Sequence, residues 1–290
     1  KEMTGSNVTG LLALPGTLRI KHPKANNFII FTNQFISIMK IKIILFITCL
    51  FSFQLIFAQS LFISKATVEY EVKVNIKKTL GNNSWAEMMK ENMPQFKTGY
   101  YRYTFAENKS VYKFDHWDEI KVPEWMRKSD EENVWYFDHT VKKFNMQKNV
   151  YGSNFNVEDS IPAIEWRLTN ENRIIAGFNC RKAVGIIMDS VYVFAFYSDE
   201  IIIPGGPCSI NGLPGLVLGL TIPRMYASWI ATKVMVNDIN VSSIKPVTAK
   251  KYFTNASLKK TLKERTKEWV NEDDPESQKW IEQLYWSTLL

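Results

Sequence analysis

Two Asp-His pairs are the residues of this sequence that most resemble catalytic groups. They are Asp115-His116 and Asp138-His139. A histidine can act as a general base for a serine or cysteine nucleophile when a carboxylate orients its ring. Adjacent residues on a strand point to opposite faces, so we expect neither aspartate to orient its own histidine. We interpret both histidines as turn or surface residues and predict no catalytic residue.

Other common kinds of catalytic site are equally weak in this sequence. His116 and His139 lie 23 positions apart, without an HExxH or CxxC pattern to suggest a metal site. Glycoside hydrolysis requires two opposed carboxylates, but the chain has so many acidic residues that any pair could be chosen. We therefore predict no metal site and no cofactor.

A secretory signal peptide is predicted within the first 58 residues. Met39-Lys40-Ile41-Lys42 is followed by an uncharged apolar run, Ile43 to Phe57, and then by Ala58. A basic start, a short apolar core and a small residue before the cleavage point are typical of signal peptides. The run is shorter than the ~20 residues needed to span a bilayer. We predict a signal peptide at 39–58, with 1–38 as an upstream extension outside the fold.

Cleavage after Ala58 has consequences for location and charge. It predicts an exported protein without a transmembrane span, located in the periplasm, at the outer membrane or outside the cell. It also removes six of the 36 basic residues and one of the 29 acidic residues, so the net charge falls from +7 to +2. Without a dense basic patch, we predict no nucleic-acid partner.

Two cysteines, Cys180 and Cys208, follow the predicted cleavage point. An even number of cysteines in an oxidising compartment favours a disulfide. The alternative is two buried free thiols. We predict the Cys180–Cys208 disulfide, with both interpretations open at the level of sequence.

Residues 59–290 are predicted to form one β-rich domain. The side chains of Val68, Tyr70, Val72, Val74 and Ile76 alternate with polar residues, which indicates a strand with one buried face. Aromatic and β-branched segments separated by turn residues indicate further antiparallel strands. We expect these strands at residues 100–105, 110–114, 133–137, 141–146, 173–178, 182–188, 191–197, 216–220 and 227–236.

Helices are predicted at two places in this domain. Ser84 begins a capping-box pattern, and Pro94 ends the short helix that follows, which we interpret as an insertion between strands. At the C-terminal end, Ser257 begins one helix and Asp274-Pro275 begins another. The second C-terminal helix carries apolar residues on one face.

Three segments of the chain resemble the GLPGLI family of exported Bacteroidota proteins. They read WRLTNENRIIAGFNCRKA (Trp166–Ala183), FAFYSDEIIIPGGP (Phe194–Pro207) and NGLPGLVLGL (Asn211–Leu220). YTFAENKSVYKF (Tyr103–Phe114) extends the similarity more weakly toward the N-terminus. The resemblance implies export and a mainly β fold, with one curved antiparallel sheet or partial barrel. It brings no established activity and no catalytic residue.

The turn that names this family is predicted to be structural. It comprises Gly212, Leu213, Pro214, Gly215 and Leu216. Proline at the second position and glycine at the third are typical of a type II turn, in which that glycine takes a positive φ. Such a turn would bring the two leucines together, and we expect them to be buried against the sheet.

These observations favour an exported, non-catalytic envelope protein that binds or supports an apolar ligand or a protein partner. One alternative is an exported hydrolase whose site is assembled from scattered residues, and another is a scaffold of a surface complex. Asp159-Ser160 and Asp189-Ser190 resemble short O-glycosylation sites, although ordinary turns also have this pattern.

Overall fold

The computed structural model describes residues 35–46, 63, 65–81, 84–118, 122–150, 152–236, 239–269 and 274–290. The chain divides into two units, Lys1–Gln59 and Ser60–Leu290. The described part of the first unit is a helix at 35–46 with exposed side chains. The rest of the predicted signal peptide, including Ala58, lies outside the described residues. Among these residues, no helix combines the length and apolar character needed to cross a bilayer.

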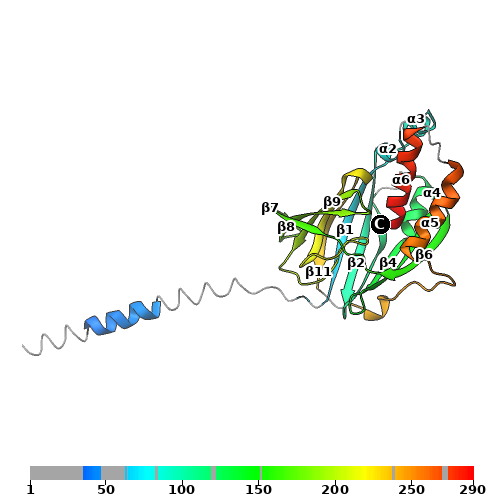
Figure 1. Ribbon diagram of the computed structural model, residues 1–290. Coiled ribbons are helices and arrows are strands. Elements are labelled where there is room, and N and C mark those ends of the chain that lie inside the picture. Colours follow the sequence, from blue (N-terminus) through cyan, green and yellow to red (C-terminus); the bar gives the residue numbers. More distant parts are fainter. Residues whose placement is uncertain are drawn as a thin grey trace, which may run out of the picture. The chain divides into compact units, whose positions relative to one another are not determined.

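The second unit is built on one antiparallel sheet, as the sequence predicts (Figure 1). Its strands are β1 (Lys65–Asn75), β2 (Phe96–Ala106), β3 (Lys109–Trp117), β4 (Val134–Asp138), β5 (Lys143–Val150), β6 (Ser153–Ser160), β7 (Trp166–Ile175), β8 (Phe178–Ile187), β9 (Val191–Ser198), β10 (Leu216–Ile222) and β11 (Ala227–Met235). On β1, Val68, Tyr70 and Val72 are buried, which confirms the predicted inner face of this strand.

The strand order is β6-β5-β4-β3-β2-β1-β11-β10-β9-β8-β7. The sheet therefore consists of two meanders, β1 to β6 and β7 to β11, in which each strand pairs with its neighbours in sequence. The two meanders join where β1 pairs with β11, for example at Val72 and Trp229. We call this pairing the seam.

The β7–β11 meander curls over its own inner face. β7 contacts β11 although three strands lie between them, whereas a flat sheet would separate them by about 19 Å. The curl brings the Ile175 side chain on β7 close to Gly219 on β10. A Cβ at Gly219 would lie only 2.8 Å from Ile175 Cδ1. The sheet is thus curved without closing into a barrel.

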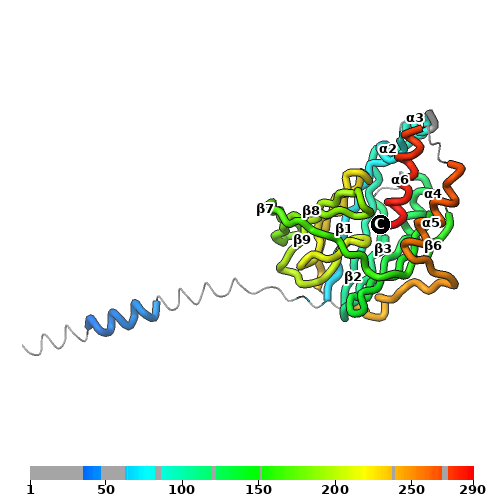
Figure 2. Tube along the Cα trace, in the orientation of Figure 1, coloured from blue at the N-terminus to red at the C-terminus, as the bar shows by residue number. Residues whose placement is uncertain are grey.

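The helices lie beside the β1–β6 meander (Figures 1 and 2). They are α2 (Ile76–Thr79), α3 (Ser84–Glu91), α4 (Glu124–Glu131), α5 (Asn255–Thr266) and α6 (Pro275–Leu289), with short 3₁₀ turns η2 (Pro223–Met225), η3 (Val241–Ser243) and η4 (Lys267–Trp269). Asp274 caps α6 by accepting a hydrogen bond from the Glu276 N–H, as its position before Pro275 predicts. The predicted α5 begins slightly earlier than expected, and Thr254 is its cap.

The predicted turn at 212–216 is buried, but its geometry differs from the prediction. Leu213 and Leu216 are both buried, which agrees with the expected apolar contact against the sheet. Positive φ occurs at Gly212 (86°) and not at Gly215, so the type II assignment is wrong. Gly215 is needed because its backbone packs against β9: a Cβ there would lie 2.0 Å from the Ser198 carbonyl oxygen.

Candidate binding cavity

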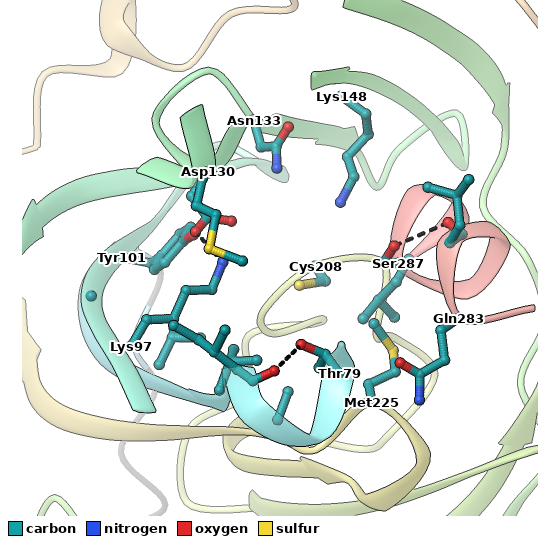
Figure 3. A pocket seen from close by; sticks show the side chains of 18 of the residues that line it. Thr79, Lys97, Tyr101, Asp130, Asn133, Lys148, Cys208, Met225, Gln283 and Ser287 are labelled. Atoms are coloured by element: carbon teal, nitrogen blue, oxygen red, sulfur yellow. Dashed lines mark hydrogen bonds and ion pairs between the residues drawn. The ribbon is translucent and has the colours of Figure 1, made fainter. Parts of the chain in front are cut away.

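A cavity of about 650 Å³ lies between the inner face of the sheet near the seam and helix α6 (Figure 3). Strands β1 to β5 and β11 contribute to its walls, together with α2, α4, η2, η4, α6 and the segment around Cys208. The residues that line it are Val72, Val74, Ile76, Thr79, Leu80, Lys97, Gly99, Tyr101, Tyr112, Trp117, Trp125, Met126, Asp130, Asn133, Trp135, Lys148, Cys208, Met225, Ala227, Trp229, Trp269, Trp280, Gln283, Leu284, Ser287 and Leu290.

Small residues beside β1 help to leave this space open. Val72 and Val74 on β1 line the cavity, and β1 is flanked by Gly99 on β2 and Ala227 on β11. In the register of the sheet, Gly99 is opposite Val72 and Ala227 is opposite Val74. A Cβ at Gly99 would lie 3.1 Å from the ring of Trp117, which also lines the cavity. Because side chains alternate along β1, Val72 and Val74 lie on the same face of the strand and together line the cavity.

The cavity wall is mainly aromatic. Six of the nine tryptophans in the chain line it. Tyr112 packs against Trp135, with 5.2 Å between the ring centroids, and stacks on Tyr101 at 5.3 Å. Trp125 and Trp269 are about half exposed, so the cavity is accessible to solvent at these residues. Such a lining suits a ligand with a large apolar surface.

Three charged side chains line the cavity: Lys97, Asp130 and Lys148. Lys97 on β2 forms an ion pair of 2.5 Å with Asp130 on α4. Lys148 on β5 is buried and points into the cavity (Figure 3). Its ammonium nitrogen lies 4.6 Å from the centroid of the Trp135 ring. Burial lowers the pKa of Lys148 to about 8, although nearby Cys208 and Asp130 oppose this effect.

The sequence did not identify Lys148 as a functional residue, although a signal for it was present. Phe144, Met146 and Lys148 alternate along β5, so they share one face of the strand. Phe144 and Met146 are buried, and Lys148 is the charged residue that continues their row. The predicted strand ended at residue 146, which left Lys148 outside the pattern.

The predicted disulfide is not formed, and Cys180 and Cys208 are free, buried thiols. Cys180 lies on β8 and donates a weak hydrogen bond to the Phe178 carbonyl oxygen. Its electrostatic neighbours are Glu200 and Asp199. Cys208 lines the cavity, where Lys148 and Asp130 are its charged neighbours, and burial raises its pKa to about 12. The two thiols occupy different environments, which the cysteine count could not predict.

The first Asp-His pair differs from the expectation. Asp115 Oδ2 lies 2.9 Å from His116 Nδ1, so this aspartate does contact its neighbouring histidine. The reason is a β-bulge: Tyr100 is opposite His116 and Tyr101 is opposite Phe114, which leaves Asp115 without a partner in the register. The alternation on which the prediction depended is therefore interrupted. His116 is exposed and stacks on Tyr100, outside the cavity lining.

The second pair follows the expectation, but its histidine has a different partner. The Asp138 carboxylate accepts hydrogen bonds from the backbone N–H groups of Thr140 and Val141. His139 Nε2 lies 3.0 Å from Ser110 Oγ, and burial lowers the pKa of His139 to about 4. A serine beside a histidine could act as a nucleophile. Ser110 is fully buried, however, and does not line the cavity.

The remaining candidate residues lie on the surface. Ser160 ends β6, and Ser190 lies in the turn between β8 and β9; both are exposed. Asp189 has a positive φ of 67°, as is common in tight turns. The described residues contain no group of three or more His, Cys, Asp or Glu side chains that could hold a metal ion.

No protein-family model matches the chain, and no curated protein matches it. Among solved structures, it is similar to PNGF-II in space group C2, with 15% identity and a TM-score of 0.45 over 68% of this chain and 32% of that chain. PNGF-II in space group P21 is 16% identical to this chain, with a TM-score of 0.44 over 66% of this chain and 32% of that chain. An uncharacterized conserved protein from Thermus thermophilus is 11% identical to this chain, with a TM-score of 0.34 over 65% of this chain and 89% of that chain.

The chain thus spans about a third of the PNGF-II chain. Similarities at these identities and TM-scores support no statement about function.

Proposed function

We propose that this protein binds a small apolar ligand in the cavity between the sheet and α6. The observation that supports this function is the aromatic lining of a cavity of about 650 Å³. Small-molecule sites commonly have volumes of about 300–1,000 Å³ and mainly apolar walls with a few polar groups. The exposed Trp125 and Trp269 give a ligand a route from solvent.

We further propose that the protein acts in the cell envelope or outside the cell, without catalysis. This part rests on the signal-peptide pattern at 39–58 and on the resemblance to the GLPGLI family. A hydrolase has less support, because the hydrogen-bonded Ser110 and His139 are not exposed to the cavity. A scaffold role in a surface complex stays a prediction from the sequence.

Binding can be tested with Nile red, an uncharged dye whose fluorescence rises in apolar sites. We expect saturable binding to the purified, delipidated protein and displacement of the dye by lauryl alcohol. Because six tryptophans line the cavity, lauryl alcohol should also change the intrinsic tryptophan fluorescence. Ala227→Phe would fill part of the cavity and should weaken dye binding by about tenfold or more.

Ile230→Phe is the matched control, because Ile230 lies on the same strand but is exposed and outside the cavity. It should bind the dye like the wild type. Circular dichroism would establish that both variants fold. Absence of saturable binding to the wild type, or equal dye binding by wild type and folded Ala227→Phe, would reject the proposed function.

A further inference from the structure

Lys148 is a buried cation without a counter-ion in the described part of the chain. Its side chain is 7% exposed and points into the cavity (Figure 3). Asp130, the acidic side chain on the cavity wall, already pairs with Lys97. No described residue accepts a hydrogen bond from the Lys148 ammonium group or forms an ion pair with it. The ammonium group lies over the face of the Trp135 ring.

This contact is a weak substitute for a counter-ion. A cation over an aromatic ring gains less than the loss of hydration costs when a charge is buried without a partner. Natural proteins rarely bury lysine unless it is paired. An anion bound in the cavity would supply the missing partner.

The charge balance of the cavity limits what that anion can be. Lys97 and Asp130 neutralise each other, and the Cys208 thiol is uncharged at neutral pH because burial raises its pKa. Of the three charged side chains on the wall, Lys148 is therefore the one left unbalanced. A single negative charge would balance it, whereas a second would meet no free cation and would face Asp130. The rest of the wall is mainly aromatic and aliphatic.

We propose that the cavity binds an amphipathic monocarboxylate, with its carboxylate on Lys148 and its apolar chain against the lining tryptophans. This inference rests on the proposed apolar-ligand function and specifies the class of ligand. Lys148 Nζ–H groups would donate to the carboxylate oxygens in a site sheltered from water, where charge-assisted hydrogen bonds are strong. The occupant would then resemble a fatty acid.

The test compares two probes that differ in their head group, laurate and lauryl alcohol, as competitors of Nile red below their aggregation concentrations. At pH 7, laurate should bind the wild type about tenfold to a hundredfold more tightly than the alcohol, because a hydrogen bond to a charged group has this effect on affinity. Lys148→Met should abolish the preference for laurate over the alcohol.

Lys143→Met is the control, because Lys143 lies on the same strand at an exposed position. It should retain the preference for laurate. The preference of the wild type should also decrease as pH rises above about 8, where the ammonium group loses its proton. Lys97, Asp130, Cys208, Tyr101 and Tyr112 also face the cavity, so the same titration in Lys148→Met isolates the contribution of Lys148.

Two results separate this inference from the proposed function. If lauryl alcohol binds in the cavity but laurate binds no better, or if folded Lys148→Met keeps the preference, the carboxylate site is rejected and apolar binding stands. If neither probe binds the wild type, both proposals fail. Tighter binding of lauryl phosphate than of laurate at pH 8 would overturn the monoanion assignment.

Discussion

The two meanders of the sheet fill their inner faces in different ways. The β7–β11 meander curls on itself, so that its own small and aliphatic side chains, such as Ala183, Ala195 and Leu218, complete the packing. The β1–β6 meander lies beside the helices, and the space between its aromatic face and α6 is not filled. The same antiparallel architecture thus provides a close-packed half and a half with room for a ligand.

The largest loss of stability is expected for a substitution at Gly215, where the close-packed half has no room for a side chain. Gly215→Ala would place a Cβ 2.0 Å from the Ser198 carbonyl oxygen, and a backbone atom cannot move aside as a flexible side chain can. We expect the free energy of unfolding to fall by about 3–5 kcal/mol, measured by urea denaturation.

Gly152→Ala is the control for the loss of glycine itself. Gly152 has a φ of +80° and open space around its Cβ position, so the substitution should cost about 1 kcal/mol through backbone strain alone. Equal losses for Gly152→Ala and Gly215→Ala would contradict the close-packing argument.

A second prediction compares the same substitution in the two halves. Ala195→Leu adds three carbon atoms to a fully buried position on β9 and should destabilise the protein by about 1–3 kcal/mol. Ala227→Leu adds the same atoms at the cavity wall, and its stability should stay within about 1 kcal/mol of the wild type. Thermal and urea denaturation of both variants provide the comparison. A larger loss for Ala227→Leu would mean that the cavity half has no spare room.

The last prediction concerns the pH dependence of stability caused by Lys148. Its pKa is about 8 in the folded protein and ordinarily 10.5, so the unfolded chain binds more protons between these values. Stability should therefore rise with pH from about 8 to about 10.5, by up to about 3 kcal/mol. Lys148→Met removes the buried charge, so it should lack this rise and be at least as stable as the wild type at pH 7.

Urea denaturation across this pH range measures the difference. Lys143→Met, which removes an exposed lysine from the same strand, should retain the rise. A rise of the same size in Lys148→Met would assign the effect to another group.

Alternation of side chains predicted much of the sheet because it depends on local sequence. It identified β1 and β2 and the core face of β1, and the cap before Pro275 identified the start of α6. It missed β6, where only Phe155 and Val157 mark the buried face among polar residues. It also missed α4, which has no buried residue.

The cavity was not predictable from local patterns, because residues far apart in the chain form it. Gly99, Lys148, Cys208 and Ala227 belong to separate segments, and only the strand order and the position of α6 bring them to one site. The disulfide prediction failed for a related reason: two cysteines in an exported chain indicate a bridge only if the fold places their sulfur atoms together.

The seam between β1 and β11 also separates two kinds of folding event. Within each meander, a strand finds its partner by closing a short loop, so these pairings have low contact order. Pairing Val74 with Ala227 instead closes a loop of more than 150 residues. The entropic cost of closure grows only with the logarithm of loop length, so the seam costs little extra stability. Its formation depends on two arrays of hairpins meeting, and the cavity beside it exists only after they have met.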